Sequence, residues 1–188
     1  MLDQAAIAPD TIRSIRRVEY ERMVEAGLFP DERIELLRGA LVAMSPQGAR
    51  HADATRRLAS ILIGHLSQRA AVSCQLPFAA TDDSEPEPDV AVHPDDNYSR
   101  AHPNRAFLVV EIAESSLAKD RAVKAAVYAE AGVAEYWVVD LARGVVEVMT
   151  EPSAGGYGRV VVRTRGEGIR LSGFPDVEVR VSDFLRGE

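Results

Sequence analysis

Three ionisable residues could together carry out chemistry on a phosphate ester. Asp89 opens the short apolar run "PDVAV", Glu111 interrupts the apolar run "FLVVEIA", and Lys124 lies in the segment "LAKDRAVKAAVYAEA". Two carboxylates from neighbouring strand starts could form an oxygen site for Mg²⁺, which needs only one or two protein carboxylates. A lysine beside them could orient an attacking hydroxide or stabilise charge that develops on a phosphate.

Asp89 and Glu111 each have an ordinary alternative role. Glu111 could be a strand-end residue that faces solvent or forms a salt bridge, although an ionised carboxylate buried there without a partner would be costly. Asp89 could be a turn aspartate. Pro88 precedes it, removes a backbone donor and favours an extended chain at this point.

Four further residues are candidate accessories. Asp120, Lys124 and Tyr128 follow one another at intervals of four, which places them along one helix face. The same spacing suits a surface ion pair beside a partly buried tyrosine. Glu35 lies in the predicted strand "RIELLRG" and His51 opens a long predicted helix. A strand glutamate is often exposed and a helix-start histidine often caps, so the spacing leaves these alternatives open.

The region around Asp89 is strongly acidic. Residues 82–96 contain seven carboxylates and no lysine or arginine. Most of them are expected in a solvated loop, and only Asp89 has a second acid on a buried strand and a lysine on the next helix. The residues assigned to the loop are Asp82, Asp83 and Glu85, while Glu87 is left unassigned.

The hydrophobic pattern predicts an α/β (α+β) fold with a central mixed β-sheet flanked by helices. Two nearly continuous apolar runs around a helical segment predict a parallel strand–helix–strand crossover, in which Ser115 or Ser116 caps the helix and Gly132 ends it. Alternating apolar and polar residues predict half-buried antiparallel strands near the C-terminus. Helices are expected within 16–31, 51–70 and 117–131, a hairpin within 33–46, strands within 71–80, 88–94, 106–113, 134–141, 144–151, 157–165 and 176–184, and a loop at 152–158.

Length and charge set further limits. The chain has 188 residues, which predicts one domain at 17–188 behind an irregular N-terminal arm at 1–16. Its net charge of −7 disfavours a large non-specific DNA surface, although a local basic patch or bound cations could reverse the field at one site. The lone Cys74 cannot form an intramolecular disulfide. No signal peptide or apolar run of about 20 residues is present, so we expect a cytoplasmic protein with no membrane contact.

Several common catalytic motifs are absent from the sequence. It contains no phosphate-binding loop, no dinucleotide-binding glycine pattern and no G-x-S-x-G elbow. A single cysteine also excludes a structural zinc cluster of the usual cysteine type.

Taken in order, the segments "IELLRG", "MSPQGARH", "PDVAV", "LVVEIAESS" and "DRAVKAAVYAEAGVAEYWVVD" resemble the Uma2 family of bacterial endonucleases, a branch of the PD-(D/E)XK nuclease superfamily. The likeness runs from about residue 17 to the C-terminus. Its most specific part is the helix-to-strand segment that ends in "AGVAEYWVVD".

The resemblance implies a restriction-endonuclease-like core and a site for Mg²⁺ or Mn²⁺. On this basis Asp89 and Glu111 become metal ligands, with the carbonyl of Ile112 as a third, and Lys124 becomes the catalytic lysine. Glu35 becomes an accessory acid near the metal. His51 becomes a pocket residue, and Tyr128 supports the helix that carries the lysine.

The sequence departs from the family pattern at three positions. The superfamily places its lysine two residues after the acid, where this chain has Ala113, so the lysine has moved to the helix. Ser115 stands where the branch usually has proline, and Glu114 is an addition whose role the sequence leaves open. The proposed acids and the lysine are all present.

Two functional hypotheses follow. The first is a metal-dependent endonuclease that hydrolyses DNA phosphodiester bonds and works as a homodimer, which would suit double-strand cutting. The second is a non-catalytic dimeric module with a nuclease fold, used for binding or assembly in a defence or mobile-element context, in which the carboxylates are vestigial.

Overall fold

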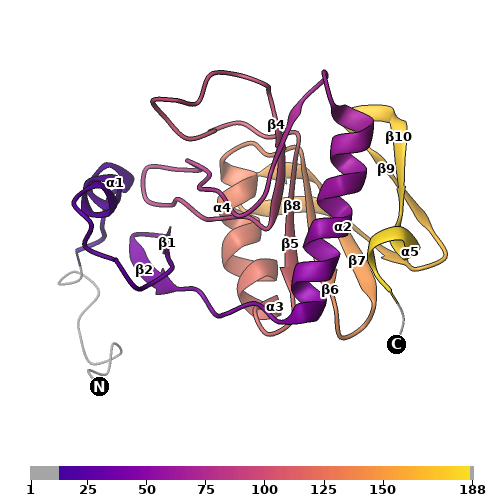
Figure 1. The fold of residues 1–188 in the computed structure, drawn as a ribbon, viewed down its shortest axis with the longest axis horizontal. Coiled ribbons are helices and arrows are strands. Elements are labelled where there is room, and N and C mark those ends of the chain that lie inside the picture. The colour runs from indigo at the N-terminus through magenta and orange to yellow at the C-terminus, as the bar shows by residue number, and fades with distance from the viewer. Residues whose placement is uncertain (1–12, 187–188) are drawn as a thin grey trace.

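A six-stranded mixed sheet forms the centre of the molecule (Figure 1). The structure, a computed structural model, describes residues 13–186, so most of the predicted arm at 1–16 lies outside the described residues. The strand order is β3-β4-β5-β6-β7-β8. The sheet strands are β3 (Ala71–Ser73), β4 (Val90–His93), β5 (Leu108–Ala113), β6 (Glu135–Asp140), β7 (Val145–Ser153) and β8 (Gly156–Thr164).

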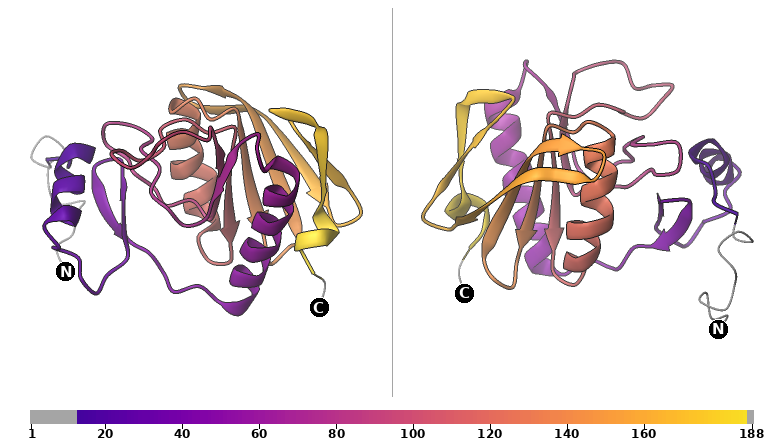
Figure 2. Two further views of the ribbon diagram at one scale, coloured as in Figure 1. Left: turned by 45° about the horizontal axis from the view of Figure 1, so that its top comes forward. Right: turned by 180° about the vertical axis from the view of Figure 1, so that it is seen from behind.

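Helices cover both faces of this sheet. The helix α2 (Ala49–Leu66) packs on one face, together with the hairpin of β9 (Gly168–Leu171) and β10 (Phe174–Arg180) and the short helix α5 (Val181–Phe184). A continuous helical stretch covers the other face (Figure 2). It consists of α3 (Leu117–Lys119), the π-helical turn η3 (Asp120–Lys124) and α4 (Ala125–Glu130).

Strand alternation explains how β5 serves both layers. Leu108, Val110 and Ile112 belong to the buried cluster on the α2 side, while Val109 and Ala113 belong to the cluster on the α4 side. Successive side chains of a strand point to opposite faces. Residue 111 therefore faces the α4 layer, and the continuous apolar pattern of β5 is that of a strand buried on both sides.

The predicted crossover is present. β5 and β6 pair in parallel, with Leu108 opposite Glu135 and Ala113 opposite Asp140, and the α3–η3–α4 stretch connects them. The other pairings within the sheet are antiparallel. Gly132 ends the helix with a φ of +75°, a conformation that glycine adopts without steric cost.

An N-terminal unit lies beside the sheet (Figure 1). It contains α1 (Arg17–Glu25) and the predicted hairpin, whose strands are β1 (Ile34–Leu37) and β2 (Ala40–Ala43). Gly39 turns this hairpin at a φ of +75°, where a β-carbon would lie 2.4 Å from that of Ser14. The loop that precedes β4 attaches to the hairpin by backbone hydrogen bonds between Glu85 and Leu36.

The structure corrects several predicted boundaries. Only residues 71–73 of the predicted strand at 71–80 are extended in the sheet, and the strand β9 has no counterpart in the predictions. The predicted strand at 176–184 ends at Arg180, because its last residues form α5. The predicted loop at 152–158 is shorter, since β7 continues to Ser153 and β8 begins at Gly156. These errors fall where short alternating segments fit more than one element.

The acidic residue Glu85 also differs from its prediction as part of a solvated loop. Its side chain is buried, and its Oε2 atom has no hydrogen-bond partner among the described residues. Burial, reinforced by the nearby carboxylate of Glu21, raises the pKa of Glu85 to about 7. The pairing of its backbone with Leu36 holds this carboxyl inside the protein.

We expect the substitution Glu85→Gln to stabilise the protein most above pH 7. The folded-state pKa exceeds the ordinary value of 4.5, so the wild-type protein loses stability as the pH rises from about 4.5 to about 7, and this loss persists at higher pH. Thermal unfolding at pH 8 should show a higher Tm for the variant, by about 2–4 °C for each kcal/mol recovered. The difference should shrink towards pH 5. A Tm difference that is the same at both values would contradict the raised pKa.

Candidate active site

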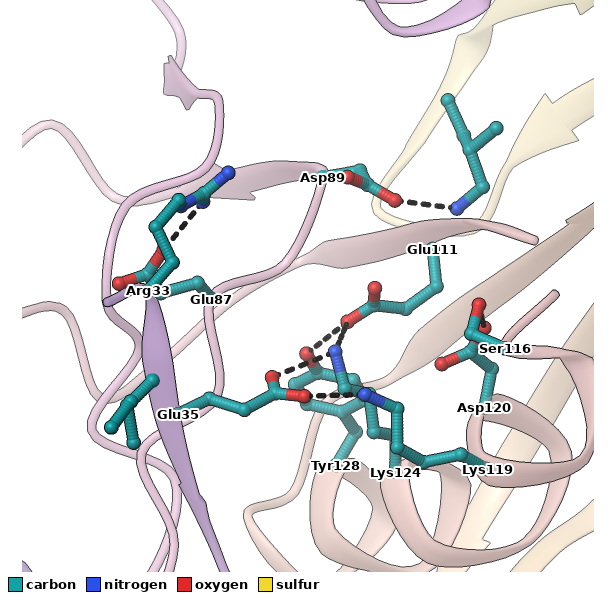
Figure 3. A network of polar contacts seen from close by, with 12 residues as sticks. Arg33, Glu35, Glu87, Asp89, Glu111, Ser116, Lys119, Asp120, Lys124 and Tyr128 are labelled. Carbon is teal, nitrogen blue, oxygen red and sulfur yellow. Dashed lines mark hydrogen bonds and ion pairs between the residues drawn. The ribbon is translucent and has the colours of Figure 1, made fainter. Parts of the chain in front are cut away.

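The buried ammonium group of Lys124 joins two carboxylates from separate elements (Figure 3). Its Nζ atom lies 3.0 Å from Oε1 of Glu111 on β5 and 2.9 Å from Oε2 of Glu35 on β1. All three side chains are at most 5% exposed. Burial acts to lower the pKa of Lys124, but the charges of Glu111 and Glu35 outweigh it and raise that pKa. The ammonium group therefore stays charged.

The two carboxylates respond differently to this environment. Burial raises the pKa of Glu35, but the neighbouring Lys124 and Lys119 outweigh burial and bring the pKa below its usual value. For Glu111, burial is the largest effect and Lys124 only partly offsets it, while Asp89 and Asp120 add negative charge nearby. The pKa of Glu111 therefore lies well above the usual range. The groups around this carboxyl supply too little positive charge to offset its burial.

Tyr128 is a second donor to Glu111. Its hydroxyl lies 2.6 Å from the same Oε1 atom that Lys124 contacts. Tyr128 comes from α4, and strand alternation turns Glu111 towards that helix. Both contacts therefore engage Oε1, and none of the described residues donates a hydrogen bond to Oε2.

Asp89 is held from two sides. Its Oδ2 atom accepts a hydrogen bond from the backbone N–H of Ile112 at 2.7 Å and lies 3.0 Å from Nε2 of His51. His51 in turn lies 3.4 Å from the hydroxyl of Thr55, one turn further along α2. Within the described part of the chain, Oδ1 of Asp89 accepts no hydrogen bond.

Glu35, Glu111, Lys124, Asp89 and His51 line one cavity of about 390 Å³, and Tyr128 lies outside its lining. The lining residues include six carboxylates and only two lysines. Asp120 belongs to this set, and its Oδ1 atom is buried without a partner, while Oδ2 accepts a hydrogen bond of 2.5 Å from Ser116. The cavity is therefore deficient in positive charge. Its charged lining residues are Glu35, Glu87, Asp89, Glu111, Glu114, Asp120, Lys119 and Lys124.

The donor set can be compared with what a hard divalent cation requires. Within residues 13–186, no group of three histidine, cysteine, aspartate or glutamate side chains is arranged to hold a metal ion. Mg²⁺ usually keeps several waters and binds through one or two carboxylates. The free oxygens of Asp89 and Glu111, which line the same cavity, fit that smaller requirement.

The structure also reveals contacts that the sequence analysis missed. Lys119 donates to Oε1 of Glu35 at 2.7 Å. In a regular α-helix, residues 119 and 124 would lie about 140° apart around the axis, but the π-helical turn between them, with its wider spacing, lets both lysines reach Glu35. Ser116 stands at the predicted cap position, yet its hydroxyl bonds to Asp120 rather than to a backbone N–H.

The structure shows the contacts of the two acidic residues whose roles the sequence left unassigned. Glu87 pairs with Arg33, with 2.7 Å between Oε2 and Nη2. Glu114 lies against Gly48 at the start of α2, where a β-carbon would come within 2.8 Å of its Oε2 atom. Both residues line the cavity.

The fold is similar to that of the crystal structure titled "a putative nuclease belonging to DUF820" from Anabaena variabilis ATCC 29413, with a TM-score of 0.67 and 13% sequence identity. The similarity covers 82% of this chain and 90% of that chain. A search of curated proteins returned no significant match.

Residues 17–182 match the family described as "Uma2: Putative restriction endonuclease", and the chain belongs to this family. The family description supports a nuclease function. Among the described residues, no helix has the length and apolar character that a membrane span requires.

We expect Tyr128→Phe to destabilise the protein more than Tyr136→Phe. Both hydroxyls are buried, but Tyr128 donates to the carboxylate of Glu111 and Tyr136 to the backbone carbonyl of Asp120. A hydrogen bond to a charged group contributes about 1.5–3 kcal/mol, against about 0.5–1.5 kcal/mol for a neutral pair. Urea unfolding at pH 8 measures both losses. Equal losses would indicate that Glu111 is uncharged at that pH.

Proposed function

We propose that this protein is a divalent-metal-dependent endonuclease that hydrolyses DNA phosphodiester bonds. One observation carries the proposal: Asp89 and Glu111 each leave one carboxylate oxygen unpaired in a single cavity, beside the charged lysine Lys124. The family and the fold support the nuclease assignment. The metal, the lysine's role and DNA as the substrate are our proposals.

In this proposal, Asp89, Glu111 and the backbone carbonyl of Ile112 hold Mg²⁺ or Mn²⁺. When bound, such an ion lowers the pKa of a coordinated water and neutralises phosphate charge. The raised pKa of Glu111 supports a cation at this position, because burial and neighbouring carboxylates leave that group short of positive charge. His51 and the N–H of Ile112 fix the orientation of Asp89 through its other oxygen.

Lys124 supplies a fixed positive charge beside the phosphate-binding position. Glu111 and Glu35 keep its pKa high, so it does not serve as a proton acceptor at neutral pH. Its chemical role is then to position the attacking water or to stabilise the negative charge that develops on the phosphate. Glu35 and Tyr128 are positioning residues, which hold the two members of the Lys124–Glu111 pair.

The proposal includes a homodimer working in the cytoplasm. A symmetric dimer supplies two copies of the site from one chain, which suits cutting both strands of a duplex.

Metal binding provides the first test. Calorimetric titration with Mn²⁺ should give a saturable heat for the wild-type protein and none for the double variant Asp89→Ala, Glu111→Ala. Glu87→Ala and Glu114→Ala together make a matched control, because they remove two other carboxylates from the same cavity. Equal binding by the wild-type protein and by the Asp89/Glu111 variant would eliminate the proposed ligands.

Cleavage provides the second test. With Mg²⁺ or Mn²⁺, the wild-type protein should nick supercoiled plasmid, and Lys124→Gln should slow nicking by about a hundredfold or more, the cost of losing one group that stabilises transition-state charge. Arg100→Gln is the control, since Arg100 is an exposed cation that does not line this cavity. Undiminished nicking by Lys124→Gln would remove that residue from the mechanism. A circular dichroism melt checks that each variant is folded.

The alternative function is a non-catalytic dimeric module used for binding or assembly. Its distinguishing result is a wild-type protein that forms a stable dimer yet neither binds Mn²⁺ nor nicks plasmid. The buried Lys124–Glu111 pair would then serve only the fold.

A further inference from the structure

A second cavity, of about 470 Å³, has the opposite charge to the candidate active site. Four arginines from separate parts of the chain line it. They come from the first turn of α2, from the turn between β6 and β7, from the turn between β8 and β9, and from the segment after α5. The arginines are Arg50, Arg143, Arg165 and Arg186.

Among the described residues that line this cavity, acidic side chains contribute little negative charge. The one carboxylate in that set is that of Asp53, which already pairs with Arg56 and Arg57 at 2.8 Å each. Within residues 13–186, neither Arg165 nor Arg186 forms an ion pair or a side-chain hydrogen bond.

Arg143 approaches two carboxylates, but only loosely. Its Nη1 atom lies 3.7 Å from Glu147 and 4.0 Å from Asp140, and its side chain is 59% exposed. Ion pairs of this kind are weak in water. Arg143 is therefore available to a competing anion.

The basic cavity adjoins the acidic one. Arg50 immediately precedes His51, which lines the candidate active site. The guanidinium of Arg50 donates to the carbonyl of Leu141 at 3.0 Å, and the N–H of Leu141 donates to the carbonyl of Ala113, next to Ile112. The second bond therefore runs from the basic cavity to Ala113, which lies between Ile112 and Glu114 of the acidic cavity, at the end of the sheet where α2 begins (Figure 1).

We propose that this arginine-lined cavity binds the phosphodiester backbone of the nucleic acid whose cleavage is proposed above. Arginine presents a rigid set of donors that matches phosphate geometry. A polyanion is repelled by a protein of net charge −7 and by an acidic cavity, so a local positive surface has to hold it. Four arginines spread over separate turns suit several phosphates along a strand better than one small anion.

The proposal rests on the proposed nuclease function, and a binding experiment without metal separates the two. Fluorescence anisotropy with a fluorescein-labelled DNA duplex in EDTA measures binding while metal-dependent cleavage is blocked. The triple variant Arg143→Gln, Arg165→Gln, Arg186→Gln should bind about tenfold more weakly or worse. Its plot of log K against log salt concentration should be shallower by up to about 0.9 for each phosphate that the variant no longer neutralises.

The matched control removes the same charge elsewhere. Arg22, Arg100 and Arg159 are exposed, lie outside the basic cavity and form no side-chain hydrogen bond or ion pair within the described residues. Changing all three to Gln should leave affinity and salt slope close to those of the wild-type protein. Thermal melts of both triple variants check that each remains folded.

The outcomes decide the two proposals separately. Loss of binding in the first triple variant alone supports the basic cavity, even if the wild-type protein never nicks plasmid. Equal binding by both triple variants overturns it, even if metal-dependent nicking is observed. A wild-type protein that does not bind the duplex also overturns it. Competition by polyglutamate as effective as that by unlabelled DNA would overturn the assignment to phosphates.

Discussion

The region around the acidic cavity depends on the burial of one ammonium group, that of Lys124, between Glu35 and Glu111. An unpaired charge at this depth would be strongly unfavourable. The hairpin that carries Glu35 forms a separate two-stranded sheet, with no strand pairing to the central sheet. Its position therefore relies on contacts such as the Lys124 ion pair and the bond from Arg38 to Glu130 on α4. The Lys124–Glu35 pair thus belongs to the site and also helps hold this unit in place.

The net charge of −7 is unevenly distributed over the protein. Carboxylates gather around a cavity whose buried groups need positive charge, and arginines gather around the cavity beside it. Net charge alone argues against contact with a polyanion. This argument changes when the two signs of charge occupy separate regions of the surface. Salt screens interactions between charges more than about 8–10 Å apart. The attraction of a phosphate in contact with the protein therefore depends on the charges close to it. An acidic protein can thus hold a phosphate backbone along one edge.

Much of the sheet follows from the sequence, because apolar runs and alternation specify buried and half-buried strands directly. The same alternation, with the following helix, places Glu111 near Lys124 and Tyr128. The contact between Lys119 and Glu35 could not be predicted, since it requires a π-helical turn and the docking of a distant hairpin. Ordinary helical spacing points Lys119 elsewhere. Long-range docking and local departures from regular geometry leave no periodic signal.

In the proposed site, the lysine stands on a different element from the one that carries it in the motif that the sequence resembles. Ala113, two residues after Glu111, occupies the position of the lysine in that motif. Alternation turns both residues towards the α4 layer, and Ala113 belongs to the same buried cluster as Ala125, the residue after Lys124. A small side chain at 113 suits close packing of the helix over this part of the strand. Lys124 reaches Glu111 from the helical layer that packs on this face of the sheet. A lysine at position 113 would instead have to reach Glu111 along the strand. Either position would place a cation on this face of β5, as the proposed site requires.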